Sequence, residues 1–174
     1  MFICVPEHPA TAGIPMKIKE IMNREVRTVH PDTSLAELAR LFAETGIHGA
    51  PVVDAENRLI GIVTESDVLN ATKTKYVKYN LVYPSIHQFG MEFKEGVEYE
   101  ELAKAFDEVK HVPVSQVMTR KVVTAGPEDL VEDIAPMMVQ KKINRIPIVE
   151  KGKVVGIVTR SDILRGLFKN QKAA

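Results

Sequence analysis

The 174-residue sequence lacks features that define several large classes of proteins. Its single cysteine, Cys4, excludes an internal disulfide and a cysteine-based metal cluster, and we expect a cytoplasmic protein. Neither sign of charge is in excess, since 23 Lys and Arg balance 23 Asp and Glu, which argues against a dedicated duplex-DNA binder or a polybasic membrane protein. No apolar run approaches the roughly 18 residues that a membrane helix needs.

Catalytic signatures are also missing. The sequence has no GxSxG, Walker, dinucleotide GxGxxG or HExxH pattern, and His30, His87 and His111 are scattered without partners at metal-ligand spacing. We therefore expect no enzyme, no metal ion and no required cofactor. A composition with 45% hydrophobic and 26% charged residues predicts one globular domain, or two small units that share a core.

The chain contains an internal duplication. IMNREVRTVHPDTSLAELA (21–39) reappears as VMTRKVVTAGPEDLVEDIA (117–135), and GIVTESDVL (61–69) reappears as GIVTRSDIL (156–164). The second copy is one residue shorter in the turn DAENRLIG, which becomes EKGKVVG. The gap therefore falls where a loop tolerates a change of length.

Each copy predicts the order strand, helix, strand, strand, helix. In the first copy an extended piece at 26–29 precedes a helix that has a capping box, Ser34-x-x-Glu37, and a stop at Gly46. Two strands joined by a polar turn follow, and then a closing helix. Because a copy of about 50 residues has little core of its own, we expect an α+β fold in which the copies pack face to face about a pseudo-twofold axis.

The second copy breaks one local rule. Pro136 falls inside its first helix, where the first copy has Arg40. An interior proline costs about 3 kcal/mol and removes a hydrogen bond, so we expect a kink or an early break at Ala135.

The order of elements and the phrase Gly-Ile-Val-Thr-x-Ser-Asp-x-Leu, present twice, make the chain resemble a tandem pair of cystathionine-β-synthase-type (CBS) domains, or Bateman module. The resemblance divides the chain into an N-terminal arm (1–16), CBS repeat 1 (17–69), an insertion (70–112), CBS repeat 2 (113–168) and a C-terminal tail (169–174). It implies a non-catalytic regulatory module that binds AMP, ADP, ATP or S-adenosylmethionine between the repeats and signals to a partner protein. It also implies a homodimer.

The repeated phrase has a chemistry of its own. Thr and Ser two residues apart, at the turn into a helix, bring hydroxyls and free amides near one point, which suits a phosphate. The aspartate accepts two hydrogen bonds, which suits the cis-diol of a ribose. The alternative is that these side chains only cap the helix. Two matched copies favour ligand binding.

The resemblance implies two clefts, each completed by a hydroxyl from the other repeat. One cleft would combine Thr64, Ser66 and Asp67 with Thr124, and the second would combine Thr159, Ser161 and Asp162 with Thr28. Residues around the proline of the middle strand, which contact phosphate or adenine in similar proteins, are here His48, Ala50, Asn144, Arg145 and Ile146.

The two clefts differ in charge. The second has Arg145 and Arg160, which suit a phosphate, whereas the first has Gly49 and Glu65 at the matching positions. A carboxylate near a phosphate costs about 1–4 kcal/mol. We therefore predict that AMP, ADP or ATP prefers the Asp162 cleft. The alternative is that the arginine and the neighbouring lysines are solvated surface charges.

The insertion, 70–112, holds most of the aromatic residues, and its apolar stripe predicts a helix: Tyr99, Leu102, Ala103, Phe106 and Val109. The insertion can pack on the repeats as a lid or extra helix, or form a dimer or partner interface. Its stretch KTKYVKYNLVY can also bind single-stranded nucleic acid, although the acidic residues that follow argue against this. For the whole chain, the further alternative is a structural or protein-interaction module without nucleotide binding.

Overall fold

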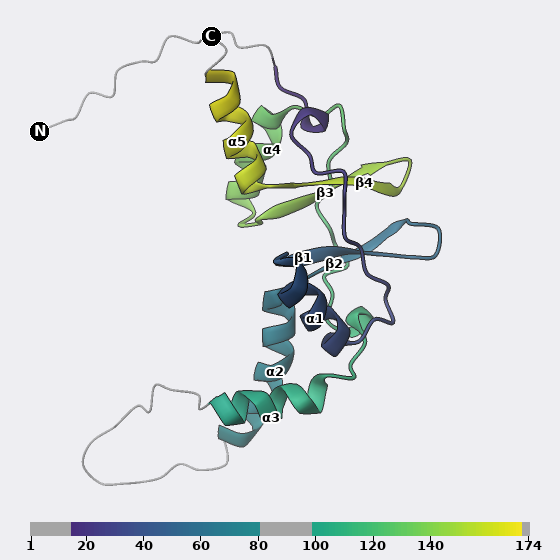
Figure 1. Cartoon of the computed structure of the whole chain (residues 1–174), viewed down its shortest axis with the longest axis vertical. Helices are drawn as coiled ribbons and strands as arrows, with labels where there is room; N and C mark the ends of the chain where they lie inside the picture. The colour runs from purple at the N-terminus through teal and green to yellow at the C-terminus, as the bar shows by residue number, and fades with distance from the viewer. Residues whose placement is uncertain (1–14, 81–98, 172–174) are drawn as a thin grey trace, which may run out of the picture.

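Two similar halves of mixed helix and strand make up the computed structural model, which describes residues 15–80 and 99–171 (Figure 1). The first half contains α1 (Leu35–Thr45), β1 (Gly49–Val53), β2 (Leu59–Thr64) and α2 (Glu65–Asn80), and α3 (Tyr99–Val109) follows it. The second half contains α4 (Val131–Gln140), β3 (Arg145–Glu150), β4 (Lys153–Thr159) and α5 (Arg160–Gln171). The expected α+β fold of two repeats is therefore confirmed.

Helix α1 begins and ends where the sequence predicts. The Ser34 hydroxyl accepts the Glu37 backbone N–H at 3.2 Å, and the Glu37 carboxylate accepts the Ser34 backbone N–H at 2.9 Å. The Ser34 hydroxyl also donates to the Glu37 carboxylate at 2.9 Å, and the bonds that this carboxylate accepts from Ser34, the backbone bond first, hold the pKa of Glu37 below its ordinary value. Gly46, with φ 67°, ends the helix and donates its N–H to the Phe42 carbonyl.

Helix α4 continues through its proline. It spans Val131–Gln140 without interruption, so the early break expected at Ala135 does not form. The fixed φ of Pro136 is compatible with a helix, and the loss is local to one turn. Burial of Ile134 and Met138, which are 4% and 1% exposed, holds the helix on the core of the second half.

Each half has a two-stranded antiparallel sheet, β1 with β2 and β3 with β4. The extended piece before the first helix adds one parallel bridge to each sheet. Val29 pairs with Val52, and Ala125 pairs with Ile148. The first strand expected in each copy is therefore reduced to a single bridge at its last residue.

The segment that precedes each repeat packs on the other repeat. Residues 16–23 lie against the second half, where Ile18 is fully buried and donates its N–H to the Asp129 carbonyl at 2.9 Å. Residues 112–119 lie against the first half in the same way, and Val114 is fully buried there. The two repeats therefore exchange their first segments, and each exchanged segment completes the core of the other half.

Glycines of the repeated phrase make room for this exchange. A Cβ at Gly61 would lie 2.5 Å from the sulfur of Met118, and a Cβ at Gly156 would lie 2.6 Å from the sulfur of Met22. Real side chains do not approach so closely. Each glycine lies inside its strand, β2 or β4, and lets the exchanged segment approach the strand closely.

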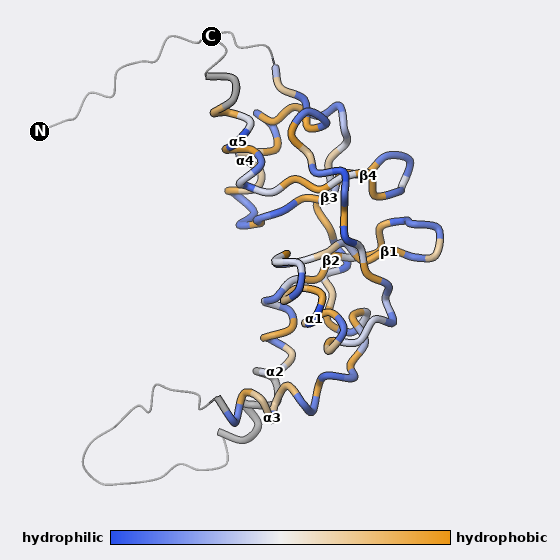
Figure 2. Tube along the Cα trace, viewed as in Figure 1, coloured by the Kyte–Doolittle hydropathy of each residue, from blue (hydrophilic) through white to orange (hydrophobic). Residues whose placement is uncertain are grey.

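The halves face each other across their hairpins (Figure 1). Leu59 donates its N–H to the Gly152 carbonyl at 3.3 Å, and the Asn57 side chain donates to the Val154 carbonyl at 3.2 Å. In Figure 2 the strands are largely hydrophobic and the hairpin tips are hydrophilic. The strands therefore meet at the middle of the molecule while the turns project from it.

The described part of the insertion is helical. Helix α2 continues to Asn80, and α3 packs against it (Figure 1), with Val109 buried in the core of the first half. Residues 81–98, with part of the aromatic and basic stretch, lie outside the described residues. Among the helices described here, none is both long and apolar enough to cross a bilayer.

Candidate functional site

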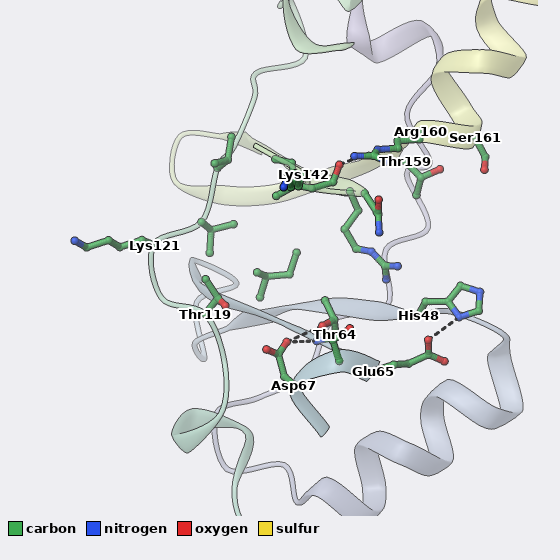
Figure 3. Close-up of a pocket in the computed structure, with 17 residues that line it drawn as sticks. His48, Thr64, Glu65, Asp67, Thr119, Lys121, Lys142, Thr159, Arg160 and Ser161 are labelled. Carbon is green, nitrogen blue, oxygen red and sulfur yellow. Dashed lines mark hydrogen bonds and ion pairs between the residues drawn. The ribbon is translucent and has the colours of Figure 1, made fainter. Parts of the chain in front are cut away.

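A cavity of about 780 Å³ lies between the two halves, a volume typical of small-molecule sites (Figure 3). It forms where β2 and β4 end and α2 and α5 begin, because the two hairpins bring these ends together. The polar residues that line it from the two repeats include His48, Thr64, Ser66, Asp67, Asn144, Arg145, Thr159 and Ser161.

Each aspartate of the repeated phrase binds the threonine three residues before it. Asp67 Oδ2 accepts the backbone N–H of Thr64 at 2.7 Å and its hydroxyl at 2.8 Å. Asp162 Oδ2 accepts the same two groups of Thr159 at 2.9 and 2.6 Å. Helix capping, the alternative kept open from the sequence, therefore occupies one oxygen of each carboxylate.

The second oxygens of these carboxylates differ. Asp162 Oδ1 lies 3.5 Å from a guanidinium nitrogen of Arg165. Asp67 Oδ1 has neither a hydrogen bond nor an ion pair within the described residues, and Asp67 lines the cavity. Asp162 instead lines a separate pocket of about 100 Å³ beside Ile21 and Gly166. The open acceptor is therefore on the Asp67 side.

Four cations line the cavity: Lys121, Lys142, Arg145 and Arg160. Arg160 is already engaged, because its guanidinium donates to the carbonyls of Met138 at 3.2 Å and Ile143 at 3.1 Å. The first carbonyl lies in the last turn of α4, where it also accepts the Ile143 backbone N–H at 3.0 Å, and the second lies three residues beyond the helix. Arg160 therefore has a structural role at this position.

Arg145 has different surroundings. It is half-buried at the start of β3, and its guanidinium makes no hydrogen bond or ion pair within the part of the chain that the structure describes. Burial lowers the pKa of Arg145 below its ordinary value, and the charge of Glu65 partly opposes this effect. A cation that loses hydration without gaining a partner is costly, so this guanidinium is poised to accept an anion.

An acidic side chain stands at the rim of the cavity. Glu65 lies 3.0 Å from His48 Nδ1, and the two side chains are 50% and 68% exposed, so their interaction is weak (Figure 3). In the same view Lys121 extends away from the other labelled side chains. Glu65 is therefore the one anion besides Asp67 among the described residues that line the cavity.

Four further predicted binding residues do not line this cavity, and two of them are buried in the cores. Ala50 and Ile146 are both 0% exposed and belong to the hydrophobic cores of their halves. Ile146 follows Arg145 on β3, and adjacent strand residues point to opposite faces, so it faces the core when Arg145 faces the cavity. Thr28 and Thr124 are not among the residues that line the cavity.

The structure also changes the expected distribution of charge. Arg145 and Arg160, expected beside Asp162, line the cavity that contains Asp67. The segment 119–123 lines it as well, through Thr119, Lys121, Val122 and Val123, which the sequence did not single out. Their nearest sequence signal is Thr124, which directly follows this segment and is predicted for the Asp67 cleft. No group of three His, Cys, Asp or Glu suitable for a metal ion occurs in the described chain.

Comparison with known proteins identifies the family. Residues 18–73 and 114–169 each match the CBS domain family. The chain therefore belongs to the CBS domain family and contains a tandem pair of these domains, as the repeated phrase indicates.

Individual relatives extend this finding. The chain is 36% identical over 155 residues to the uncharacterized protein MJ1426 of Methanocaldococcus jannaschii, covering 88% of this chain and 92% of that protein. The CBS domain of a CBS domain containing membrane protein from Sphaerobacter thermophilus is similar with a TM-score of 0.63 and 34% identity, over 87% of both chains. The CBS domain pair of protein MJ0100, solved in complex with 5′-methylthioadenosine and S-adenosyl-L-methionine, has a TM-score of 0.62 and 26% identity, over 90% of this chain and 98% of that chain.

Other relatives are much longer than this chain. It spans 44% of protein MJ1225 of Methanocaldococcus jannaschii and 24% of the inosine-5′-monophosphate dehydrogenase of Bifidobacterium longum. CBS pairs therefore make up nearly the whole of some relatives and a part of others, enzymes among them.

Proposed function

We propose that this chain is a non-catalytic regulatory module that binds an adenosine-containing ligand, AMP, ADP, ATP or S-adenosylmethionine, between its CBS repeats and signals to a partner protein. The observation that carries the proposal is the half-buried Arg145 without an anionic partner, in the same cavity as the open oxygen of Asp67. The adenosyl ligands of the similar MJ0100 pair support the same ligand class.

The chemistry of the cavity matches the parts of such a ligand. Asp67 Oδ1 is an acceptor for ribose hydroxyls, and the first N–H groups of α2 have no acceptor within their own helix. Ile62, Val122 and Ile143 supply apolar wall for a purine base. Arg145 supplies a guanidinium for an anionic group.

Regulation follows from the position of the cavity. Its lining comes from both repeats, so a bound ligand contacts both halves at once. A ligand that binds one relative orientation of the halves better shifts the population toward that orientation. A partner protein that contacts both halves then binds the two orientations with different affinity.

A thermal-shift assay with AMP, ADP, ATP and S-adenosylmethionine tests the proposal. Ligand at about 100 times its dissociation constant stabilises the protein by about 2.7 kcal/mol, which raises its melting temperature. Asp67→Asn keeps an acceptor for the helix cap and should reduce the shift, whereas Glu150→Gln at the exposed end of β3 should leave it unchanged. If no adenosine compound stabilises the protein, the proposal fails and the alternative of a structural or protein-interaction module is favoured.

We also propose a homodimer, with a second copy of this chain covering an exposed apolar face. Large hydrophobic side chains on α2 and α5 are unusually exposed: Leu69 at 50%, Leu164 at 56%, Leu167 at 49% and Phe168 at 66%. Both helices lie along the same edge of the molecule in Figure 1, opposite the hairpin tips. Exposed patches of this kind mark interaction sites.

A further inference from the structure

Gly49 and Arg145 are equivalent positions in the two repeats. Gly49 begins β1 and pairs with Thr64 at the end of β2. Arg145 begins β3 and pairs with Thr159 at the end of β4. The duplication therefore placed two very different side chains at one structural position.

These two residues meet where the repeats meet. A Cβ at Gly49 would lie 2.5 Å from Nη1 of Arg145, 2.9 Å from the Val63 carbonyl oxygen and 3.0 Å from Cγ2 of Thr64. The guanidinium of Arg145 therefore lies over the bare Cα of Gly49, in the space that any side chain would occupy. A second arginine at position 49 would compete for this space and bring two like charges together.

Because Arg145 reaches over Gly49 of the other repeat, its guanidinium lies in only one of the two expected clefts. Arg145 belongs to the second repeat, yet it lines the cavity with Thr64, Ser66 and Asp67 of the first. On the other side, Asp162 is paired with Arg165, and its pocket has about one eighth of the volume, 100 Å³ against 780 Å³.

We propose that Gly49 and Arg145 restrict this pair of CBS domains to one anion-binding site. One phosphate-bearing adenosine ligand then binds per chain, in the Asp67 cavity, and its phosphate contacts Arg145. This inference rests on the proposed function. S-adenosylmethionine has no phosphate and carries two cationic groups, the sulfonium and the ammonium, beside a single carboxylate. It therefore gains less from the guanidinium and binds more weakly than AMP.

Calorimetric titration of the full chain with AMP, and separately with S-adenosylmethionine, tests the inference. The expected result is one AMP per chain and a weaker interaction with S-adenosylmethionine. Arg145→Gln should weaken AMP binding roughly 10- to 100-fold, the range for a hydrogen bond to a charged group, and change the affinity for S-adenosylmethionine much less. The matched control, Arg165→Gln beside Asp162, should leave AMP binding unchanged.

A second variant tests the role of the glycine. Gly49→Ala places a methyl group where the guanidinium lies, so AMP affinity should fall while the circular dichroism spectrum stays that of the native fold. In the Arg145→Gln background the alanine still meets the Val63 carbonyl at 2.9 Å, but it no longer displaces the guanidinium, so its cost to AMP affinity should be smaller than in the wild type. Equal losses of AMP affinity in both backgrounds would overturn the role of Gly49.

The remaining outcomes separate this inference from the proposed function. Two AMP molecules per chain, or AMP binding that Asp162→Asn abolishes and Arg145→Gln leaves intact, would overturn the single site and keep the regulatory module. Absence of binding by every adenosine compound would overturn the proposed function itself.

Discussion

Arg145 and Arg160 line one cavity, but the atoms around them assign them different roles. Arg160 donates to the backbone carbonyls of Met138, in the last turn of α4, and Ile143, three residues beyond the helix. Arg145 has lost part of its hydration and has gained no partner among the described residues. The sequence makes both candidates for a phosphate, because partners that lie 17 and 22 residues away are not visible in a local pattern.

We therefore expect Arg160→Gln to affect stability more than binding. Loss of the two bonds should lower the free energy of unfolding by about 0.5–1.5 kcal/mol, because Arg160 is exposed and the Met138 carbonyl keeps the Ile143 N–H. AMP affinity should change less than in Arg145→Gln. Urea denaturation and AMP titration measure the two effects, and a tenfold loss of affinity with unchanged stability would contradict this division of roles.

The capping box of α1 is a residue-scale feature that the sequence predicts correctly, since its two members are three residues apart. Ser34→Ala leaves the Glu37 N–H without its acceptor and should lower the free energy of unfolding by about 1 kcal/mol. Ser34→Thr keeps the hydroxyl and is the matched control. Equal unfolding free energies for the alanine and threonine variants would show that this cap does not stabilise the helix.

At the scale of elements, the exchange of first segments is the feature that the sequence does not reveal. The alignment joins residues 17–23 to the first repeat because they precede it, while Ile18 is buried in the core of the second half. A hydrophobic pattern predicts that a segment is buried. It does not predict in which of two similar cores the segment is buried. The predicted helices and hairpins are correct because their signals are local.

The exchange predicts which half loosens when a buried residue is removed. Ile18→Ala should destabilise the protein by about 2–5 kcal/mol and raise amide exchange in the second half, around Val158, more than around Val63 in the first. Val114→Ala, at the equivalent position, should do the reverse. Hydrogen–deuterium exchange followed by mass spectrometry resolves the two halves. If amide exchange in Ile18→Ala rose more near Val63 than near Val158, the first segment would not belong to the core of the second half.

An ion-pair cluster helps to tie the first segment to the second half. Glu128 accepts hydrogen bonds from Lys17 at 2.7 Å and Lys19 at 2.6 Å, and these bonds, Lys17 first, lower its pKa from 4.5 to about 2. Because the folded pKa lies below the ordinary one, the cluster stabilises the fold above about pH 4.5, and this contribution is lost as the pH falls toward 2.

We expect Glu128→Gln to flatten the dependence of the melting temperature on pH between 4.5 and 2. The contribution is fully present at pH 7, and because the Glu128 side chain is 62% exposed, solvent screening keeps both this contribution and its loss at low pH small. Glu132→Gln, at an exposed position of α4, is the control. Melting curves at several pH values measure the difference, and identical pH profiles of wild type and Glu128→Gln would contradict the linkage.

At the scale of the whole molecule, the exposed face of α2 and α5 predicts the oligomeric state. Leu164→Glu combined with Phe168→Glu places charges in the proposed interface and should give the mass of a monomer in light scattering, where the wild type gives a dimer. Ala55→Glu, in the hairpin turn on the opposite edge, should remain dimeric. A wild-type monomer, or a dimer that tolerates both glutamates, would contradict the proposed interface.

At the scale of the whole molecule, the sequence predicts some of the residues in the site but not the distribution of charge between the two clefts. Three residues of the first copy of the Thr-x-Ser-Asp phrase line the cavity, namely Thr64, Ser66 and Asp67, and their binding of a ligand stays a prediction. The side on which the charge gathers depends on Arg145 crossing over Gly49. That crossing joins two residues far apart in the chain, and only the packing of the halves reveals it.

The crossed first segments also limit how this protein can be divided. A fragment cut between the copies keeps a complete set of its own helices and hairpins but loses the buried residues that the other fragment donates, Ile18 in one case and Val114 in the other. Each fragment alone would leave part of its hydrophobic core exposed to water. When the two fragments are mixed, each would supply the segment that completes the core of the other. The chain is thus suited to split-protein complementation, in which refolding reports that two fused partners have met.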